Sequence, residues 1–71
     1  MKLNDLKLND EGVISKVWAN DNIKKRLMDI GFVRGVKIKP VLISKTIRAY
    51  NIKNTIISVR NKDTEDIEVN L

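Results

Sequence analysis

The sequence contains no cysteine and no histidine, and only one proline, three glycines and three aromatic residues among its 71 positions. Without Cys or His, neither a disulfide framework nor a Cys/His zinc site can hold the fold together. The usual general base and the thiol nucleophile are missing as well, so Asp, Glu, Lys, Ser and Thr are the only candidate catalytic groups. We therefore expect a protein that is not an enzyme and carries no cofactor.

Long apolar runs are also absent. No stretch approaches the roughly eighteen apolar residues that a helix needs to cross a bilayer. The first ten residues, MKLNDLKLND, are too polar for a signal peptide. We expect a cytoplasmic protein that is not inserted directly into the membrane.

Acidic residues are missing from one half of the chain. The formal net charge is +5, and the segment from Ile30 to Lys62 contains no Asp or Glu. Such asymmetry favours an acidic partner, which can be a phosphate backbone, lipid headgroups or an acidic protein surface. The simpler explanation is a set of solvated strand faces. The basic residues concerned are Arg34, Lys37, Lys39, Lys45, Arg48, Lys53, Arg60 and Lys62.

The length predicts a single small domain, residues 1–71, with a thin core, because a chain of this size buries only about 60% of its unfolded surface. Leu3, Leu6 and Leu8 predict a short turn that closes one end of this core. The β-branched segment GVISKVWA, residues 12–19, predicts a first strand.

One convincing helix follows, in NDNIKKRLMDIG, residues 20–31. Asn20 or Asp21 can cap its start. Ile23, Leu27 and Ile30 follow the i, i+4, i+7 spacing of a core-facing stripe.

After the helix the sequence has the alternation of strands. Lys37 and Lys39 alternate with apolar residues until Pro40 changes the phase, which predicts a bulge or an edge position. Lys53 and Asn54 suit a two-residue hairpin turn. The residues NKDTED predict a capped helical turn, and the segment 67–69 predicts a last short strand. The predicted fold is mainly β: a small, partly open barrel of about five short strands with one α-helix inserted after the first strand.

The stretch RLMDIGFVRG, residues 26–35, predicts the end of the helix. Gly31 takes the left-handed position just beyond the helix, and Phe32 folds back onto the last turn. Gly35 turns the chain into the next strand. The two glycines do not form a phosphate-binding loop, because no Lys-Ser/Thr pair follows them and they come after a helix instead of before one.

Asp63, Glu65, Asp66 and Glu68 form an acidic cluster without the loop spacing of a calcium site. We favour the interpretation that these carboxylates cap a turn and keep the strand surface solvated.

Taken together, several segments resemble the FeoA family, the small proteins of bacterial ferrous iron uptake. The most specific part combines Arg26-Leu27, Ile30-Gly31-Phe32 and Gly35. We interpret Leu27, Ile30, Gly31 and Gly35 as its structural signature. Further matches are Leu3 with Leu6, Gly12 to Val17, and Ile57 to Arg60.

The resemblance implies an SH3-like β-barrel and a non-enzymatic accessory role. The implied partner is a FeoB-type membrane permease with a cytosolic GTPase domain, which the protein would bind and modulate. Direct contact of surface carboxylates with Fe(II) would at most be weak, since their spacing does not support a site. The segment 43–47 departs from the family because it lacks a proline-glycine loop, so its conformation and any partner contact there stay open.

The partner surface that we expect lies near the helix end, at Arg26, Met28, Phe32 and Arg34. Each of these residues also has a purely structural explanation, and for Phe32 that explanation is favoured. The alternative function is a small basic barrel that binds single-stranded nucleic acid, which the scarcity of stacking aromatics makes unlikely. Oligomeric state stays open.

Overall fold

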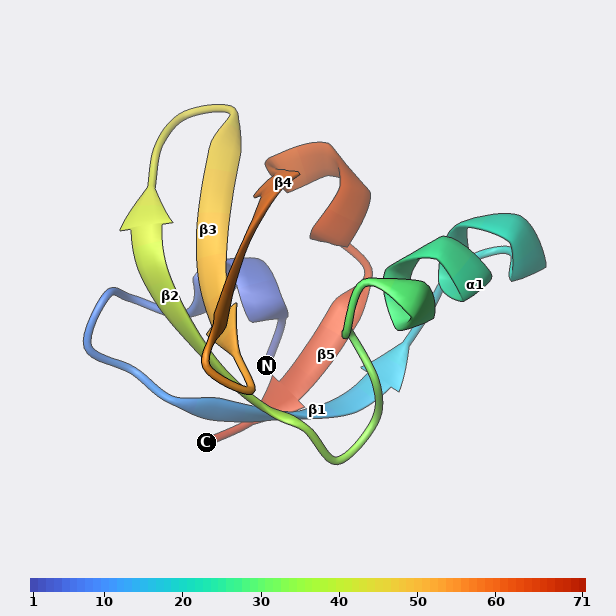
Figure 1. The fold of residues 1–71 in the computed structure, drawn as a ribbon, viewed down its shortest axis with the longest axis horizontal. Coiled ribbons are helices and arrows are strands. Elements are labelled where there is room, and N and C mark those ends of the chain that lie inside the picture. The colour runs from blue at the N-terminus through green and yellow to red at the C-terminus, as the bar shows by residue number, and fades with distance from the viewer.

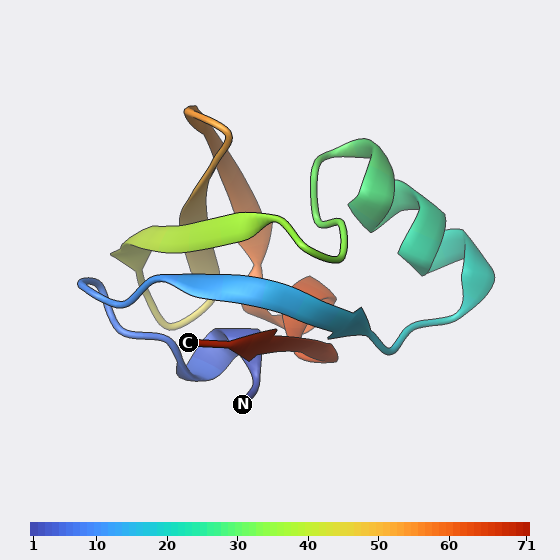
Figure 2. The ribbon, with the colours of Figure 1, turned by 90° about the horizontal axis from the view of Figure 1, so that it is seen from below.

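The computed structural model describes all residues, 1–71, and places them around one five-stranded antiparallel sheet with the order β4-β3-β2-β1-β5. The sheet bends back on itself, so that β2, β3 and β4 face β1 and β5 across the core (Figures 1 and 2). The predicted mainly β fold, with one helix after the first strand, is confirmed. The elements in chain order are η1 (Leu3–Asp5), β1 (Gly12–Val17), α1 (Asp21–Asp29), β2 (Lys37–Ile43), β3 (Ile47–Ile52), β4 (Thr55–Arg60), η2 (Asn61–Thr64) and β5 (Ile67–Asn70).

The predicted bulge at Pro40 is confirmed. Pro40 pairs with Tyr50 of β3, but the next pair joins Leu42 to Ala49, so one residue of β2 has no opposite partner. A bulge bends the strand and increases its twist, which a small barrel needs in order to close.

The hairpin between β3 and β4 also matches its prediction. Lys53 and Asn54 both have positive φ, 51° and 64°. These are the values that a two-residue type I′ turn requires, and Asn adopts them more readily than Lys.

The β2–β3 connection, whose conformation the sequence left open, is an ordered turn. The Ser44 hydroxyl accepts a hydrogen bond from the Ile47 N–H and donates one to the Ile47 carbonyl. From η2, the Asn61 side-chain amide donates to the carbonyls of Ser44 and Lys45 at 3.2 and 3.1 Å. The turn is therefore tied to a distant part of the chain.

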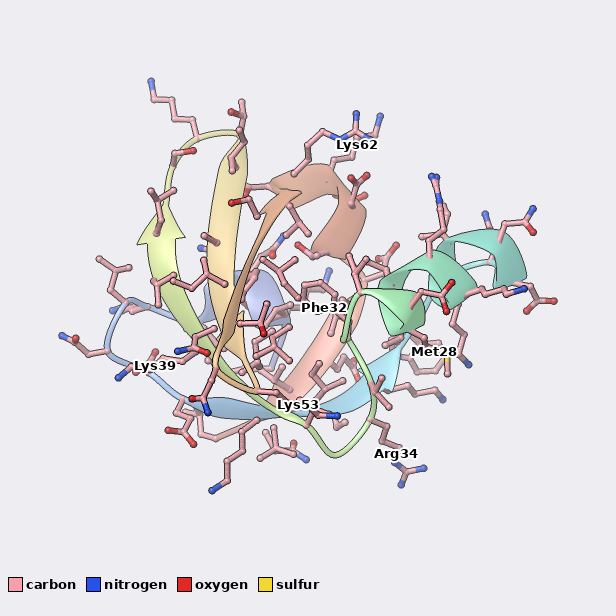
Figure 3. The ribbon with its side chains drawn as sticks, viewed as in Figure 1. Met28, Phe32, Arg34, Lys39, Lys53 and Lys62 are labelled. Carbon is pink, nitrogen blue, oxygen red and sulfur yellow. The ribbon has the colours of Figure 1, made fainter.

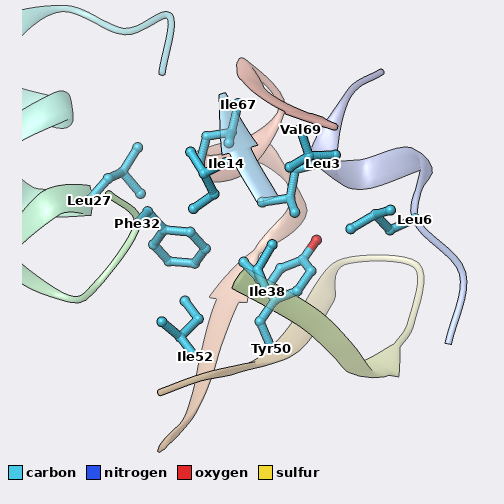
Figure 4. Close-up of a cluster of buried hydrophobic side chains, with 10 residues drawn as sticks. All are labelled: Leu3, Leu6, Ile14, Leu27, Phe32, Ile38, Tyr50, Ile52, Ile67 and Val69. Atoms are coloured by element: carbon cyan, nitrogen blue, oxygen red, sulfur yellow. The ribbon is translucent and has the colours of Figure 1, made fainter. Parts of the chain in front are cut away.

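Ten buried apolar residues form the core, and they come from both halves of the sheet, from η1 and from the end of α1 (Figure 4). Leu3 and Leu6 close one end of it, as predicted. Leu8 does not, because its side chain is 49% exposed in the turn that follows η1. None of the helices is long and apolar enough to pass through a bilayer.

Candidate partner-binding site

The end of α1 is closed by the cap that the sequence predicts. The Phe32 N–H donates to the Leu27 carbonyl at 2.9 Å, and the Gly31 N–H donates to the Met28 carbonyl at 3.1 Å. These two bonds define the Schellman motif, in which the residue after the helix takes positive φ. Gly31 has a φ of 117°. The cap fixes the direction in which the chain leaves the helix.

Phe32 belongs to the core. Its side chain is 0% exposed, and its ring meets that of Tyr50 edge to face with 6.0 Å between centroids (Figure 4). The prediction that Phe32 contributes to a partner surface is therefore wrong. The hydrophobic contact of the helix cap, with Leu27, takes the ring inward.

The other three predicted contact residues are exposed. Arg26 lines a groove beside α1. Met28, which is 47% exposed, lies outside that groove, and Arg34 stands on the connection to β2 (Figure 3). Arg26 thus lies in a hollow that a partner could fill.

The predicted core-facing stripe of α1 is buried at one position only. Leu27 is 5% exposed and joins the core, whereas Ile23 and Ile30 are 41% and 44% exposed. The helix reaches the barrel through its last turn, and its first turns extend beyond the sheet (Figure 2). The prediction was wrong for Ile23 and Ile30, because a stripe on one helix is buried only as far as the opposing surface extends.

The two exposed isoleucines instead line a groove between α1 and the end of β4. Its volume is about 530 Å³. β4 pairs with β3 only, so its other edge has no strand partner. The groove is lined by Ile23, Arg26, Leu27, Asp29, Ile30, Val59, Arg60 and Asp63.

Both signs of charge stand at the rim of this α1–β4 groove. Arg60 donates two hydrogen bonds to the Asp63 carboxylate, at 3.0 and 3.4 Å. Arg26 and Asp29 stand on the helix side. The groove is therefore lined by aliphatic side chains together with charges of both signs, which suits an apolar segment with polar flanks.

Arg48 differs from the other basic residues of the acid-free half, because it is only 9% exposed. Its guanidinium donates to the Leu6 carbonyl at 3.2 Å and to the Tyr50 hydroxyl at 3.3 Å. That hydroxyl donates in turn to Asn4, which also accepts from Thr64 at 2.9 Å. The sequence analysis counted Arg48 among the basic residues and did not predict that it points inward. Its spacing of two residues from Tyr50 on one strand, which puts both side chains on the same face, could have indicated this.

Burial raises the pKa of Tyr50 above its usual value of 10.0, and the nearby Arg48 opposes this shift in part. The phenol is therefore held in its neutral form at ordinary pH. It acts as a hydrogen-bonding group inside the fold.

The acidic cluster near the C-terminus is not gathered into one site. No group of three or more His, Cys, Asp or Glu side chains lies where it could hold a metal ion. Asp63 is already bound to Arg60. Weak contact with Fe(II) stays a prediction.

Comparison with known proteins gives a consistent result. The model of the FeoA domain matches residues 1–71. No curated protein sequence matches. Among solved structures, the FeoA protein of Chlorobium tepidum is 32% identical with a TM-score of 0.89, over 100% of this chain and 70% of that one.

Two further structures have the same fold at lower identity. Iron(II) transport protein A of Clostridium thermocellum is 26% identical with a TM-score of 0.92, and this chain, fully covered, spans 45% of it. FeoA of Stenotrophomonas maltophilia, solved with zinc, is 26% identical with a TM-score of 0.83, over 99% of this chain and 89% of that one. The latter is described as a prokaryotic SH3 domain protein and suggested as a ferrous iron transport activating factor. With a family match along its whole length, this chain belongs to the FeoA family.

Proposed function

We propose that the protein is a non-enzymatic accessory factor of ferrous iron transport that binds a cytosolic segment of a FeoB-type permease in the α1–β4 groove. The observation that carries the proposal is the pair Ile23 and Ile30, which stand more than 40% exposed on a helix beside a strand with an unpaired edge. The family match supports the transport role.

The groove suits an extended peptide segment. Such a segment can add main-chain hydrogen bonds along the free edge of β4 while placing alternate apolar side chains against the helix. Its polar flanks would meet Arg26 and Asp63 at the rim. The binding would be weak to moderate, because a single groove of this size buries less surface than a standard interface.

A titration against the cytosolic domain of the permease tests this function. Ile23→Ser and Ile30→Ser should each weaken binding roughly tenfold, since each removes an aliphatic contact worth more than 1 kcal/mol. Both side chains are already exposed, so the fold should tolerate the changes.

Met28→Ser is the matched control, because Met28 is equally exposed on the same helix but lies outside the groove. We expect it to bind as the parent protein does. If Met28→Ser weakened binding while Ile30→Ser did not, the partner would occupy the opposite side of α1 and the groove assignment would fail. No binding by the parent protein at tens of micromolar would refute the accessory role itself.

The structure weakens the case for single-stranded nucleic acid. Phe32 and Tyr50 are both 0% exposed, so two of the three aromatic rings cannot stack with bases. Trp18 is exposed, but the Lys16 ammonium already lies 3.5 Å from the centroid of its ring.

A further inference from the structure

The outer face of the β2–β3–β4 sheet is not covered by any other element. Along β3, the side chains of Arg48, Tyr50 and Ile52 face inward, so Ile47, Ala49 and Asn51 lie on the opposite, outer side, where the small Ala49 is only 5% exposed. Strand pairing then gives the rest of that face. Leu42 and Ser58 flank Ala49, Lys39 and Ile56 flank Asn51, and Arg60 lies beside Ile47.

Large aliphatic side chains on this face are exposed to solvent. Leu42 is 50% exposed, Ile47 is 43% exposed and Ile56 is 65% exposed. They come from three different strands, so one flat partner could contact them together. Exposed large aliphatic side chains that share one face in this way can mark an interaction site.

Lysines accompany these aliphatic residues. Lys37 and Lys39 line a shallow hollow with Lys53 of the β3–β4 turn, and Glu11 is the one carboxylate beside it. Arg60 is neutralised by Asp63 and adds little free charge. We call the surface formed by Lys37, Lys39, Leu42, Ile47, Lys53 and Ile56 the basic sheet face (Figure 3 labels Lys39 and Lys53).

We propose that the basic sheet face binds the surface of an anionic lipid bilayer. Lysine ammonium groups are attracted to anionic headgroups, and aliphatic side chains gain free energy from burial at the acyl boundary. The face contains no Trp, Tyr or unpaired Arg, the residues that dominate protein–protein binding energy. It also contains no aromatic ring on which bases could stack.

This attachment is peripheral and adds no membrane-spanning segment. It uses a different surface from the α1–β4 groove, so both could be occupied at once. A protein held at the membrane surface would meet a membrane-embedded transporter at raised effective concentration. The proposal itself does not depend on the identity of that transporter.

Co-sedimentation with lipid vesicles tests the proposal. The parent protein should bind vesicles of mixed phosphatidylcholine and phosphatidylglycerol at low salt, and added salt should release it from them. It should not bind vesicles of pure phosphatidylcholine. A variant with both Lys39→Gln and Lys53→Gln should show roughly 25-fold weaker partitioning, at about fivefold for each lysine. Ile56→Ser should reduce it several-fold, by removing an aliphatic contact.

Matched controls stand on α1. The pair Lys24→Gln and Lys25→Gln removes the same charge from an exposed helix surface, and Met28→Ser removes an exposed apolar side chain that lies outside the α1–β4 groove. We expect both controls to retain most of the vesicle binding. Equal losses from the helix and sheet pairs, no binding to anionic vesicles at low salt, or tighter binding to single-stranded oligonucleotides would each overturn the proposal.

Discussion

Gly31 occupies the position at the end of α1 where a side chain is most strongly disfavoured. Its φ of 117° lies in a region that L residues rarely adopt, and an added Cβ would already contact Ile52 at 3.4 Å. Two hydrogen bonds of the helix cap depend on this conformation. Backbone geometry therefore explains why a glycine stands at this position.

Replacing Gly31→Val should lower the free energy of unfolding by about 2 kcal/mol or more, because a β-branched residue resists positive φ. Urea unfolding measures the loss. Met28→Val, at an exposed and ordinary helical position, is the control and should cost less than about 1 kcal/mol. An unchanged midpoint for Gly31→Val would show that the cap is not formed as described.

Arg48 and Tyr50 form a buried polar network that ties β3 to both ends of the chain. Asn4 of η1 and Thr64 of η2 complete it. Burying a guanidinium without a carboxylate partner costs free energy unless its N–H donors form hydrogen bonds. Here the Leu6 carbonyl and the Tyr50 hydroxyl each accept a hydrogen bond from Arg48.

The single tyrosine allows a direct test of this burial. Since the folded pKa of Tyr50 is raised, ionisation favours the unfolded chain. The stability contribution is fully present below pH 10 and is lost as the pH rises through the folded pKa. Tyrosinate absorbance should therefore titrate above 10.0 in the folded protein and near 10.0 in denaturant. Identical titration curves in both states would contradict a buried phenol.

At the scale of elements, the β3–β4 hairpin places Lys53 in a backbone conformation that lysine does not favour. Lys53 has a φ of 51° at a turn position that Asn and Gly prefer. The turn forms because β3 and β4 pair along their whole length and their register leaves two residues for the connection.

Lys53→Asn should raise the free energy of unfolding by about 0.5 to 1 kcal/mol, because Asn tolerates the left-handed region at lower cost. Lys45→Asn provides the comparison, since Lys45 lies in the other hairpin turn without positive φ. It should change stability little. A gain of similar size in both variants would mean that loss of charge, and not backbone conformation, is responsible.

Helix α1 forms from local sequence signals but is only partly buried. The Asn20 side chain accepts from the Ile23 N–H at 3.0 Å, as predicted for a cap, so the start of the helix is fixed locally. The depth at which it packs depends on the barrel. For that reason Leu27 is in the core, whereas Ile23 and Ile30 line the groove.

At the scale of the whole molecule, three lysines, Lys37, Lys39 and Lys53, gather around one hollow of the surface. The exposed lysines of the basic sheet face repel one another, and little acidic surface lies near them. Self-repulsion of this kind destabilises the folded state and is reduced by salt.

Unfolding in urea should therefore require more denaturant in moderate salt than in low salt, with a gain of up to about 1 kcal/mol. A variant with Lys37→Gln, Lys39→Gln and Lys53→Gln should be less sensitive to salt than the parent protein. If its sensitivity equalled that of the parent, charge elsewhere in the molecule would be the cause.

Short-range chemistry made much of this fold predictable. The Asn20 cap, the Gly31 turn, the Pro40 bulge and the Lys53-Asn54 hairpin each depend on residues that are neighbours in sequence. Leu8, Ile23 and Ile30 were misjudged because burial depends on what lies opposite, which no local pattern states.

The sequence by itself determined the strand and helix content, the turns and the excess of basic charge, because these follow from backbone preference and composition. Only the tertiary structure decided which basic residues are free, since Arg48 turns inward to donate to the Leu6 carbonyl, from a distant part of the chain, and to the Tyr50 hydroxyl. It also decided where partners can bind. The groove and the basic sheet face exist because strands and helix far apart in sequence lie side by side, and because a small barrel leaves part of its helix and one sheet face uncovered.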